Sequence, residues 1–343
     1  MKVALADLSA QYGELAAEID TAVRRVLASG HYILGEDVGA FEQEMARDAG
    51  RAHAIGLSSG SDALLAGLWA LGVGPGDEVV TSALSFFATA GAIARLGATP
   101  VFSDIDPATF DLDPDGLPIT LRTKAIVPIH LFGRPADRIA TELPILEDAA
   151  QAVGSTKLGP LVALSFFPSK NLGAAGDAGM LMTDDYELAD RVRLYRAHGA
   201  RPKYEHHVIG ANLRMDTLQA AILRAKRPHL ARWNARRRAN ALRYHELLAA
   251  TPLVLPADAP GHVWHQFVVR APKRDELRSF LRQREIETEV YYPKPLHQQT
   301  PFARGQSLPH AEQACREVLA LPVHPHLDDS QLEYVADAIR AFY

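Results

Sequence analysis

The sequence predicts an α/β fold with a mainly parallel sheet and flanking helices, followed by a smaller C-terminal α+β domain. Apolar runs of strand length alternate with segments of helical period through the first two thirds of the 343 residues. Polar residues gather directly after several of these runs, where open α/β sheets bind their ligands. From Asp216 to about residue 250 the helical period is interrupted by Pro228, which breaks a helix. We therefore expect a large domain over residues 1–228 and a small domain over residues 229–343.

The large domain is expected to alternate short strands with helices. Each predicted strand is an apolar run bounded by turn residues, and each predicted helix carries the 3.6-residue period. The predicted strands are 54–57, 78–80, 99–103, 125–129, 144–146 and 161–166. The predicted helices are 61–71 and 88–96, and a Gly/Pro turn at 72–77 separates the first helix from the second strand.

The small domain is expected to mix both element types in a different order. The predicted strands are 262–270 and 287–292, and the predicted helices are 274–284, 311–320 and 330–342. Because this order does not continue the regular rhythm of the large domain, we interpret it as an α+β unit.

The composition excludes several classes of function. Lys plus Arg is 36 and Asp plus Glu is 41, so the formal net charge is −5, the wrong sign for binding nucleic acid. The single cysteine, Cys315, excludes an intramolecular disulfide, and the histidines have no partners at ligand spacing, so we predict no metal. No signal peptide is visible and no segment reaches the roughly 18 apolar residues of a membrane span, so we expect a cytoplasmic protein without membrane contacts.

The segment 58–64 follows a predicted strand and opens a predicted helix. Its free backbone N–H groups, above all those of Gly60 and Ser61, act together with the helix dipole to favour an anion such as a phosphate. The alternative is ordinary helix capping by Ser61 or Asp62 at a tight turn.

Two other segments place reactive groups after strands. Asp148 ends one predicted strand as a largely buried carboxylate, for which a protonated heterocyclic nitrogen is a suitable partner. Lys170 follows strand 161–166 in apolar surroundings, which lower the pKa of an amine and make it nucleophilic. The alternatives are an Asp148 that caps the next helix and a Lys170 that is solvated.

A pyridoxal phosphate site needs four parts, and all of them are present here. They are a phosphate-binding helix N-terminus, a buried aspartate, a glutamine one helical turn after it and a lysine beyond the next strand. Six ordered stretches closely resemble the pyridoxal-phosphate-dependent nucleotide-sugar aminotransferases, the DegT/StrS family of the aspartate aminotransferase (fold type I) superfamily. They are 54–64, 85–90, 147–151, 165–173, 212–221 and 289–297. The resemblance runs from about Asp7 to the C-terminal helix, and several spaced motifs together argue against a chance match.

The resemblance implies the roles of the residues around the cofactor ring. Lys170 matches the catalytic lysine that forms the Schiff base and then carries the proton. Asp148 matches the catalytic carboxylate that keeps the pyridine nitrogen protonated. Gln151 matches the residue near the phenolic oxygen, and Phe86 matches the aromatic ring that stacks on the pyridine face.

The resemblance also implies how the phosphate is held. Gly60 and Ser61 match its backbone donors, and Ser165 matches a hydroxyl donor. Asn212 matches an asparagine that the neighbouring subunit contributes, so the protein is expected to be a homodimer with shared active sites.

The implied reaction is a transamination in which L-glutamate leaves as 2-oxoglutarate and a keto sugar linked to a nucleoside diphosphate takes the amino group. The stretch from Tyr291 to His297 is more similar to relatives that use 3-keto sugars than to those that use 4-keto sugars. Arg214, Tyr291, Tyr292 and His297 match positions around the family's sugar pocket, while capping, core packing and a surface imidazole stay open as other roles. The product would be an amino sugar nucleotide for surface polysaccharide or glycosylated metabolites.

The chain departs from the family pattern in two connections, 132–144 and 154–165, which look short, and in Val153, where a histidine is common. A sugar dehydratase on the same fold is one rival function, but its relatives replace the Schiff-base lysine by histidine, and Lys170 argues against it. A non-catalytic regulator that binds pyridoxal phosphate is another, although no DNA-binding domain or basic face is visible. A protein that binds the cofactor but has lost sugar turnover is the third.

Overall fold

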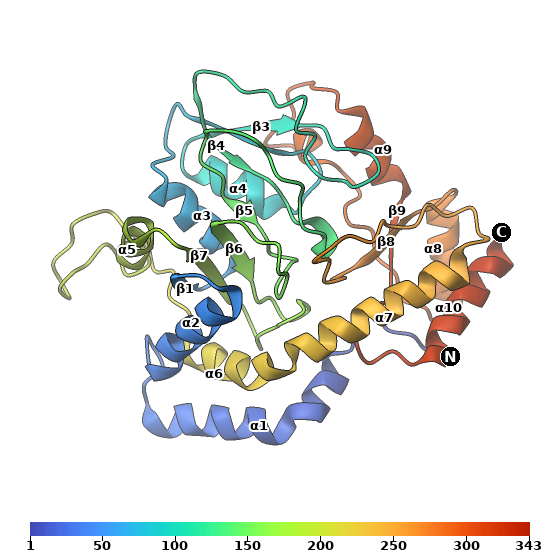
Figure 1. The fold of residues 1–343 in the computed structure, drawn as a ribbon, viewed down its shortest axis with the longest axis horizontal. Helices are drawn as coiled ribbons and strands as arrows, with labels where there is room; N and C mark the ends of the chain where they lie inside the picture. Colours follow the sequence, from blue (N-terminus) through green and yellow to red (C-terminus); the bar gives the residue numbers. More distant parts are fainter.

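A computed structural model describes residues 1–343 and shows a larger and a smaller part connected by one long helix, α7 (Figure 1). The larger part contains two sheets. The first is parallel, with the strand order β3 (Thr99–Ser103), β2 (Glu78–Ser82), β4 (Thr123–Val127). The second has the order β1 (His53–Leu57), β7 (Gly179–Thr183), β6 (Leu161–Ser165), β5 (Glu147–Asp148). Two parallel bridges, Ile126 to Ile145 and Ile129 to Asp148, connect β4 with β5, so the predicted α/β class is confirmed.

The helices of the larger part cover both faces of the sheet. They are α1 (Leu8–Ser29), α2 (Glu36–Ala49), α3 (Gly60–Ala70), α4 (Phe87–Arg95), α5 (Tyr186–Tyr195) and α6 (Thr217–Lys226). Ile55 and Leu181 pack into the same core as α3, whereas Ala54 and Met180 pack with α2 and α6 on the opposite face. Because both faces are buried, the strands are continuous apolar runs rather than alternating ones.

The helix break predicted at Pro228 is present. Helix α6 ends at Lys226, the 3₁₀ turn η2 (Arg227–His229) contains the proline, and α7 (Leu230–Leu248) continues into the smaller part. One apolar core nevertheless includes residues of both parts, such as Leu84 and Leu296. The domain boundary at residue 228 stays a prediction.

The smaller part differs from the prediction at three places, the first of which is the predicted strand 262–270, where only Phe267–Arg270 form a strand. It contains α8 (Arg274–Gln283), α9 (Pro309–Glu317), α10 (Asp329–Phe342) and an antiparallel pair, β8 (Phe267–Arg270) with β9 (Val318–Leu321). The predicted helix 311–320 was wrong in its last residues, because the fully buried run 318–321 pairs with β8 instead. The predicted strand 287–292 was also wrong, since only Glu289 forms an isolated bridge, to Ala320.

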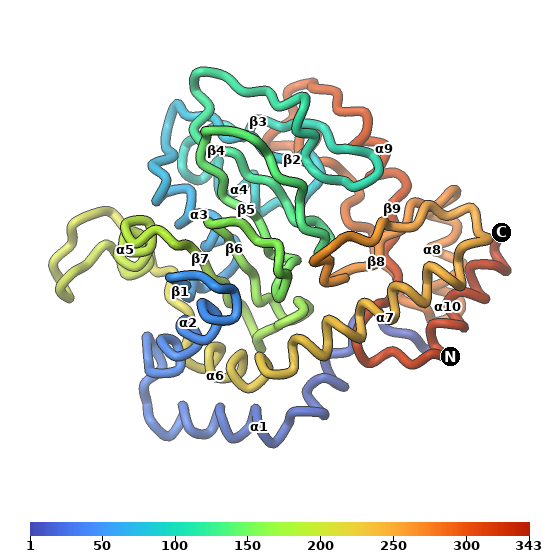
Figure 2. The backbone as a smooth tube through the Cα atoms, in the orientation of Figure 1, coloured from blue at the N-terminus to red at the C-terminus, as the bar shows by residue number.

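The two ends of the chain lie at the smaller part (Figure 2). Val3 forms a parallel bridge with Ile286, and the hydroxyl of Tyr343 donates to the carbonyl of Pro272. The first residues therefore join the smaller part before α1 crosses to the larger one. None of the helices combines the length and apolar character needed to cross a membrane.

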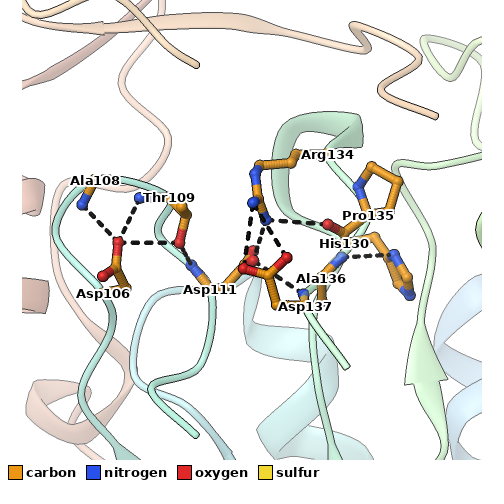
Figure 3. A network of polar contacts seen from close by, with 9 residues as sticks. All are labelled: Asp106, Ala108, Thr109, Asp111, His130, Arg134, Pro135, Ala136 and Asp137. Carbon is orange, nitrogen blue, oxygen red and sulfur yellow. Dashed lines mark hydrogen bonds and ion pairs between the residues drawn. The ribbon is translucent and has the colours of Figure 1, made fainter. Parts of the chain in front are cut away.

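The connection between the parallel strands β4 and β5, which looked short in the sequence, contains no α-helix; its only regular turn is η1 (Leu131–Gly133). Polar contacts hold this segment (Figure 3). Arg134 pairs with Asp111 and with Asp137, and Nδ1 of His130 accepts a backbone N–H of the same loop at 3.1 Å. Burial raises the pKa of Asp111 to about 6, against the opposing effect of Arg134. Ion pairs and hydrogen bonds, rather than a helix, hold this connection in place.

Strand β7 was not predicted and is the exception to the parallel order, since it runs antiparallel to both β1 and β6. Its first residue, Gly179, has no room for a side chain, because a Cβ atom there would lie 2.2 Å from the carbonyl carbon of Ser59. Close approach of this backbone therefore positions the turn between β1 and α3.

Replacing Gly179 by alanine is expected to lower the free energy of unfolding by about 1–3 kcal/mol, because the added methyl group must displace backbone. Urea denaturation measures this loss. Gly39 in α2 is the matched control: a Cβ atom there meets nothing within 4 Å, so Gly39→Ala should stabilise by about 0.5–1 kcal/mol. Equal losses in the two variants would contradict the role of the close approach.

Candidate active site

A cavity of about 420 Å³ lies where the loops after β1, β2, β4, β5 and β6 meet the smaller part. The larger part contributes Ser59, Gly60, Ser61, Ser85, Phe86, His130, Asp148, Gln151, Ser165 and Lys170. The smaller part contributes His265, Gln266, Tyr291 and Tyr292. Its volume lies in the range of small-molecule sites, and its position at the carboxyl ends of parallel strands is the expected one.

The N-terminus of α3 opens into this cavity. The helix is capped by Ser59, whose hydroxyl accepts from the backbone N–H of Asp62 at 3.1 Å, so capping by Ser61 or Asp62 was the wrong alternative. The N–H groups of Gly60 and Ser61 lie in the first turn, where a helix offers them no acceptor. A Cβ atom on Gly60 would lie 2.6 Å from Cβ of Ser165, so only glycine lets the helix end approach that serine. The three residues form a cradle of donors suited to a phosphate.

Asp148 lies at the end of β5 and is 6% exposed. The hydroxyl of Thr89 donates to its Oδ2 at 2.7 Å, and the backbone N–H of Ala150 donates to its Oδ1 at 3.2 Å. Burial raises the pKa of Asp148, and these donors and Lys170 oppose that rise. The carboxylate therefore does not cap a helix but is held in the cavity, where a cationic partner would relieve its desolvation.

Lys170 follows β6 at the end of a tight turn, in which its backbone N–H donates to the carbonyl of Phe167 at 2.8 Å. Burial lowers the pKa of its amine to about 8, although Asp148 acts in the opposite direction. The lowered pKa increases the fraction of neutral, nucleophilic amine near neutral pH. The alternative of an ordinary solvated lysine does not fit this position.

Gln151, Tyr292, Tyr291 and Phe86 complete the cavity wall. The amide oxygen of Gln151 accepts from the backbone N–H of Phe132, and its Nε2 donates to the hydroxyl of Tyr292 at 3.3 Å. Burial raises the pKa of both tyrosines. Phe86 lies at the mouth, 59% exposed, with its ring centroid 6.1 Å from that of Tyr292.

Three of the residues named from the sequence lie outside the cavity. Asn212 is exposed, and its side-chain oxygen accepts from Nε of Arg214 at 2.9 Å. His297 is 2% exposed and lies 3.2 Å from Oε1 of Glu312, within the smaller part. The structure therefore does not bring His297 to the expected sugar pocket, because its ring is buried in the smaller part and makes this polar contact there.

Several polar residues of the site were not identified from the sequence, and three of them bear on its chemistry. Thr89 in α4 and Ser85, which precedes that helix, form a chain to Asp148, since their hydroxyls lie 3.2 Å apart. Both lie in the stretch 85–90 that resembles the family, which was the available signal. His265 is a buried ring on the opposite wall, and no local pattern in the sequence distinguishes it from a core histidine.

Replacing Thr89 by valine is expected to lower kcat about 10- to 100-fold, because a hydrogen bond to a charged group contributes about 1.5–3 kcal/mol. Losing this donor raises the pKa of Asp148, so the acidic limb of the kcat profile should move to higher pH. Thr89→Ser keeps the hydroxyl and should restore both properties. A loss of thermal stability without any shift of the pH profile would contradict this role.

The model of the DegT/DnrJ/EryC1/StrS aminotransferase family matches residues 14–340. A pleiotropic regulatory protein of Geobacillus stearothermophilus is 48% identical, covering 100% of this chain and 99% of the relative. The dTDP-3-amino-3,4,6-trideoxy-alpha-D-glucose transaminase of Streptomyces venezuelae is 44% identical, covering 99% of this chain and 96% of the relative.

The fold is also similar to a solved structure. The protein ntda of Bacillus subtilis, solved with bound cofactor PMP, superimposes with a TM-score of 0.95 at 33% sequence identity. The match covers 99% of this chain and 85% of the other. The α/β architecture with its smaller C-terminal part is therefore that of a known group of enzymes.

Proposed function

This chain belongs to the DegT/DnrJ/EryC1/StrS aminotransferase family, and from this premise we propose that it is a transaminase for a keto sugar linked to a nucleoside diphosphate. Pyridoxal 5'-phosphate is its cofactor and L-glutamate its amino donor, leaving as 2-oxoglutarate. The observation that carries the proposal is one cavity that holds a partly buried lysine, a buried aspartate and an open helix N-terminus.

The residues present fit this cofactor. Gly60, Ser61 and Ser165 offer donors for its phosphate, and the close approach at Gly60 leaves no room for any side chain there. Asp148 is a buried carboxylate that has no cationic partner at hydrogen-bond distance. The protonated ring nitrogen of the cofactor would be such a partner. Lys170 is an amine of lowered pKa in the same cavity.

When bound, pyridoxal phosphate withdraws electrons from the carbon that carries the amino group. The amine of Lys170 would hold the cofactor in the resting enzyme, and its Nζ would serve as the base that takes the proton from the α-carbon of the amino donor. The lowered pKa of Lys170 keeps its amine near the working range of a base at neutral pH. Asp148 would stabilise positive charge on the heterocycle, while Thr89 and Ala150 hold its carboxylate in place by donating hydrogen bonds to it.

The keto group of the substrate is at C3 of the sugar. The Streptomyces relative is named for a 3-amino sugar on dTDP, and the stretch that suggested 3-keto substrates places Tyr291 and Tyr292 in the cavity wall. Arg214 is available to a substrate anion only if a partner subunit brings that surface to the cavity, because it lies outside the wall.

We further propose a homodimer in which Asn212 reaches the phosphate of the partner's cofactor. Support comes from the exposed position of Asn212 and from Phe86 and Phe167, which line the cavity although they are 59% and 52% exposed. Co-expression of a Lys170→Ala chain with an Asn212→Ala chain tests this. Mixed dimers would contain one complete site, so about a quarter of wild-type activity should return. No recovery, in a mixture shown to form mixed dimers, would exclude the shared site.

The reaction is tested by the visible spectrum of the protein with pyridoxal phosphate. L-Glutamate should convert the resting band to that of the aminated cofactor, and a dTDP-linked 3-keto sugar should reverse the change and yield the amino sugar. If the resting band is present but does not change on addition of glutamate, a non-catalytic regulatory function is favoured instead. The name of the Geobacillus relative suggests such a function. The dehydratase is disfavoured because Lys170 is present.

We also propose that the enzyme works in the cytoplasm. A single cysteine, Cys315, buried in the core, suits a reducing compartment such as the cytoplasm. The nucleotide-linked amino sugar would then supply glycosyl transfer to a surface polysaccharide or a metabolite. Fractionation of cells that carry the tagged chain tests the location.

A further inference from the structure

His265 is the one imidazole that the smaller part contributes to the cavity, and the mechanism above does not use it. It precedes β8, is 7% exposed and shares the cavity with Lys170 and Asp148. Its Nδ1 lies 3.1 Å from Oδ1 of Asn171, the neighbour of Lys170 in the chain. Its other ring nitrogen, Nε2, makes no hydrogen bond to the protein and is not among the buried unpartnered atoms. Nε2 is therefore open to the cavity.

The contacts of Asn171 determine which nitrogen of His265 carries hydrogen. The amide nitrogen of Asn171 donates to Oδ1 of Asn234 at 2.7 Å and to the carbonyl oxygen of Val263 at 2.8 Å. Both partners are acceptors in this arrangement, because Nδ2 of Asn234 itself donates to the carbonyl oxygen of Val153. The amide of Asn171 thus has one orientation, and its oxygen faces the ring. Nδ1 of His265 must donate, so Nε2 of the neutral ring is an acceptor.

The surroundings keep this ring neutral. Arg237 is buried and has no carboxylate partner; its guanidinium donates to the carbonyl oxygens of His265 at 3.2 Å and of Trp264 at 3.5 Å. Lys170 provides a second positive charge from the cavity side. Burial, together with Lys170 and Arg237, holds the pKa of His265 well below its usual range. A second proton on Nε2 is therefore disfavoured, and the neutral ring, held by Asn171, offers a lone pair of fixed direction to the cavity.

An acceptor with fixed direction suits only one of the two substrates. L-Glutamate presents carboxylate oxygens, which need donors, and its amino group is engaged in the reaction. A sugar presents hydroxyl groups, which donate. We propose that Nε2 of His265 accepts a hydrogen bond from a hydroxyl group of the keto sugar and thereby selects hydroxylated sugars in the second half-reaction. This inference rests on the proposed function, since it needs a sugar substrate.

The test uses the whole enzyme with its cofactor and measures the two half-reactions separately by single-turnover spectroscopy. L-Glutamate probes the first, and a dTDP-linked 3-amino-3,6-dideoxyhexose, run in the reverse direction, probes the second. His265→Asn keeps a side-chain N–H near Nδ1 for Asn171 and removes the acceptor at Nε2. His265→Gln instead places an amide oxygen near the position of Nε2.

His265→Asn is expected to lower the rate constant over KM for the sugar about 10- to 100-fold while leaving the glutamate half-reaction within about twofold. His265→Gln should recover part of the sugar reaction. Equal losses in both half-reactions would overturn the inference, because His265 would then act on Lys170 or the cofactor. An unchanged sugar reaction in His265→Asn would overturn it as well, since the ring would be structural only.

The failure of the proposed function has a different signature. In that case the wild-type enzyme responds to glutamate but to no nucleotide-linked amino sugar, and the inference fails with it. If the wild type turns over the sugar and the two His265 variants turn it over at the wild-type rate, the proposed function stands and only the role of His265 is rejected.

Discussion

Replacing Lys170 by alanine is expected to abolish transamination, with a loss of at least about 10³-fold, because the same amine holds the cofactor and moves the proton. The visible band of the resting enzyme should disappear, since no other amine lies in the cavity wall. Glutamate should then cause no rapid spectral change. The measurement is the absorption spectrum of the purified variant with pyridoxal phosphate, followed by the rate of 2-oxoglutarate formation.

Lys226 offers a matched control for this change. It is a lysine even more buried than Lys170, 7% exposed, but its amine donates to Oε1 of Gln11 and to the carbonyl oxygen of Gly173, outside the cavity. Lys226→Met should lower the thermal midpoint while keeping the resting band. If Lys170→Ala retained the band and its response to glutamate, another group would have to be the reactive amine and the site would be misassigned.

Replacing Asp148 by asparagine is expected to lower kcat by about 10²- to 10⁴-fold while leaving the cofactor bound. The variant keeps the shape of the side chain and an oxygen that accepts from Thr89, but it removes the negative charge. Leaving one partner of a buried charge pair alone costs about 3–5 kcal/mol, which sets the expected range. Single-turnover kinetics with glutamate measure the loss in the step that Lys170 performs.

Two comparisons separate this effect from a general loss of structure. Asp37 is a buried aspartate, 2% exposed, paired with Arg25 and Arg224 outside the cavity, so Asp37→Asn should reduce stability without a comparable loss of kcat. A cofactor analogue with carbon in place of the ring nitrogen should also make the wild type and Asp148→Asn equally slow. If Asp148→Asn still differed from the wild type by orders of magnitude with this analogue, Asp148 would not act through the ring nitrogen.

Much of the larger part was predictable because its signals are local. The strands at 99–103 and 161–166 are short buried runs with turn residues at both ends, and the structure has β3 at the same residues and β6 within one residue. Pro228 likewise marks the end of α6 by removing a backbone donor. Asp148 and Lys170 were identifiable because each comes directly after such a run, where strand ends meet ligands.

The errors occur where a remote partner decides the outcome. Residues 318–321 continue a helical period, but pairing with β8 makes them a strand. His297 lies in a recognisable motif, yet its ring packs beside Glu312 instead of facing the cavity. In both cases the local sequence is compatible with two conformations or positions of the residue, and a contact with a distant segment decides which one forms.

The sequence by itself determined the class of the fold, the position of the helix break and the reactive groups that follow the strands, because periodicity, Pro and Gly signals and residue chemistry act over a few neighbours. The tertiary structure alone decided how those groups are tuned. Thr89 reaches Asp148 across 59 positions, and Asn171 and Arg237 together define the hydrogen-bonding state of His265. Burial, hydrogen bonding and pKa depend on which distant segments pack together, and that information arises only when the chain folds.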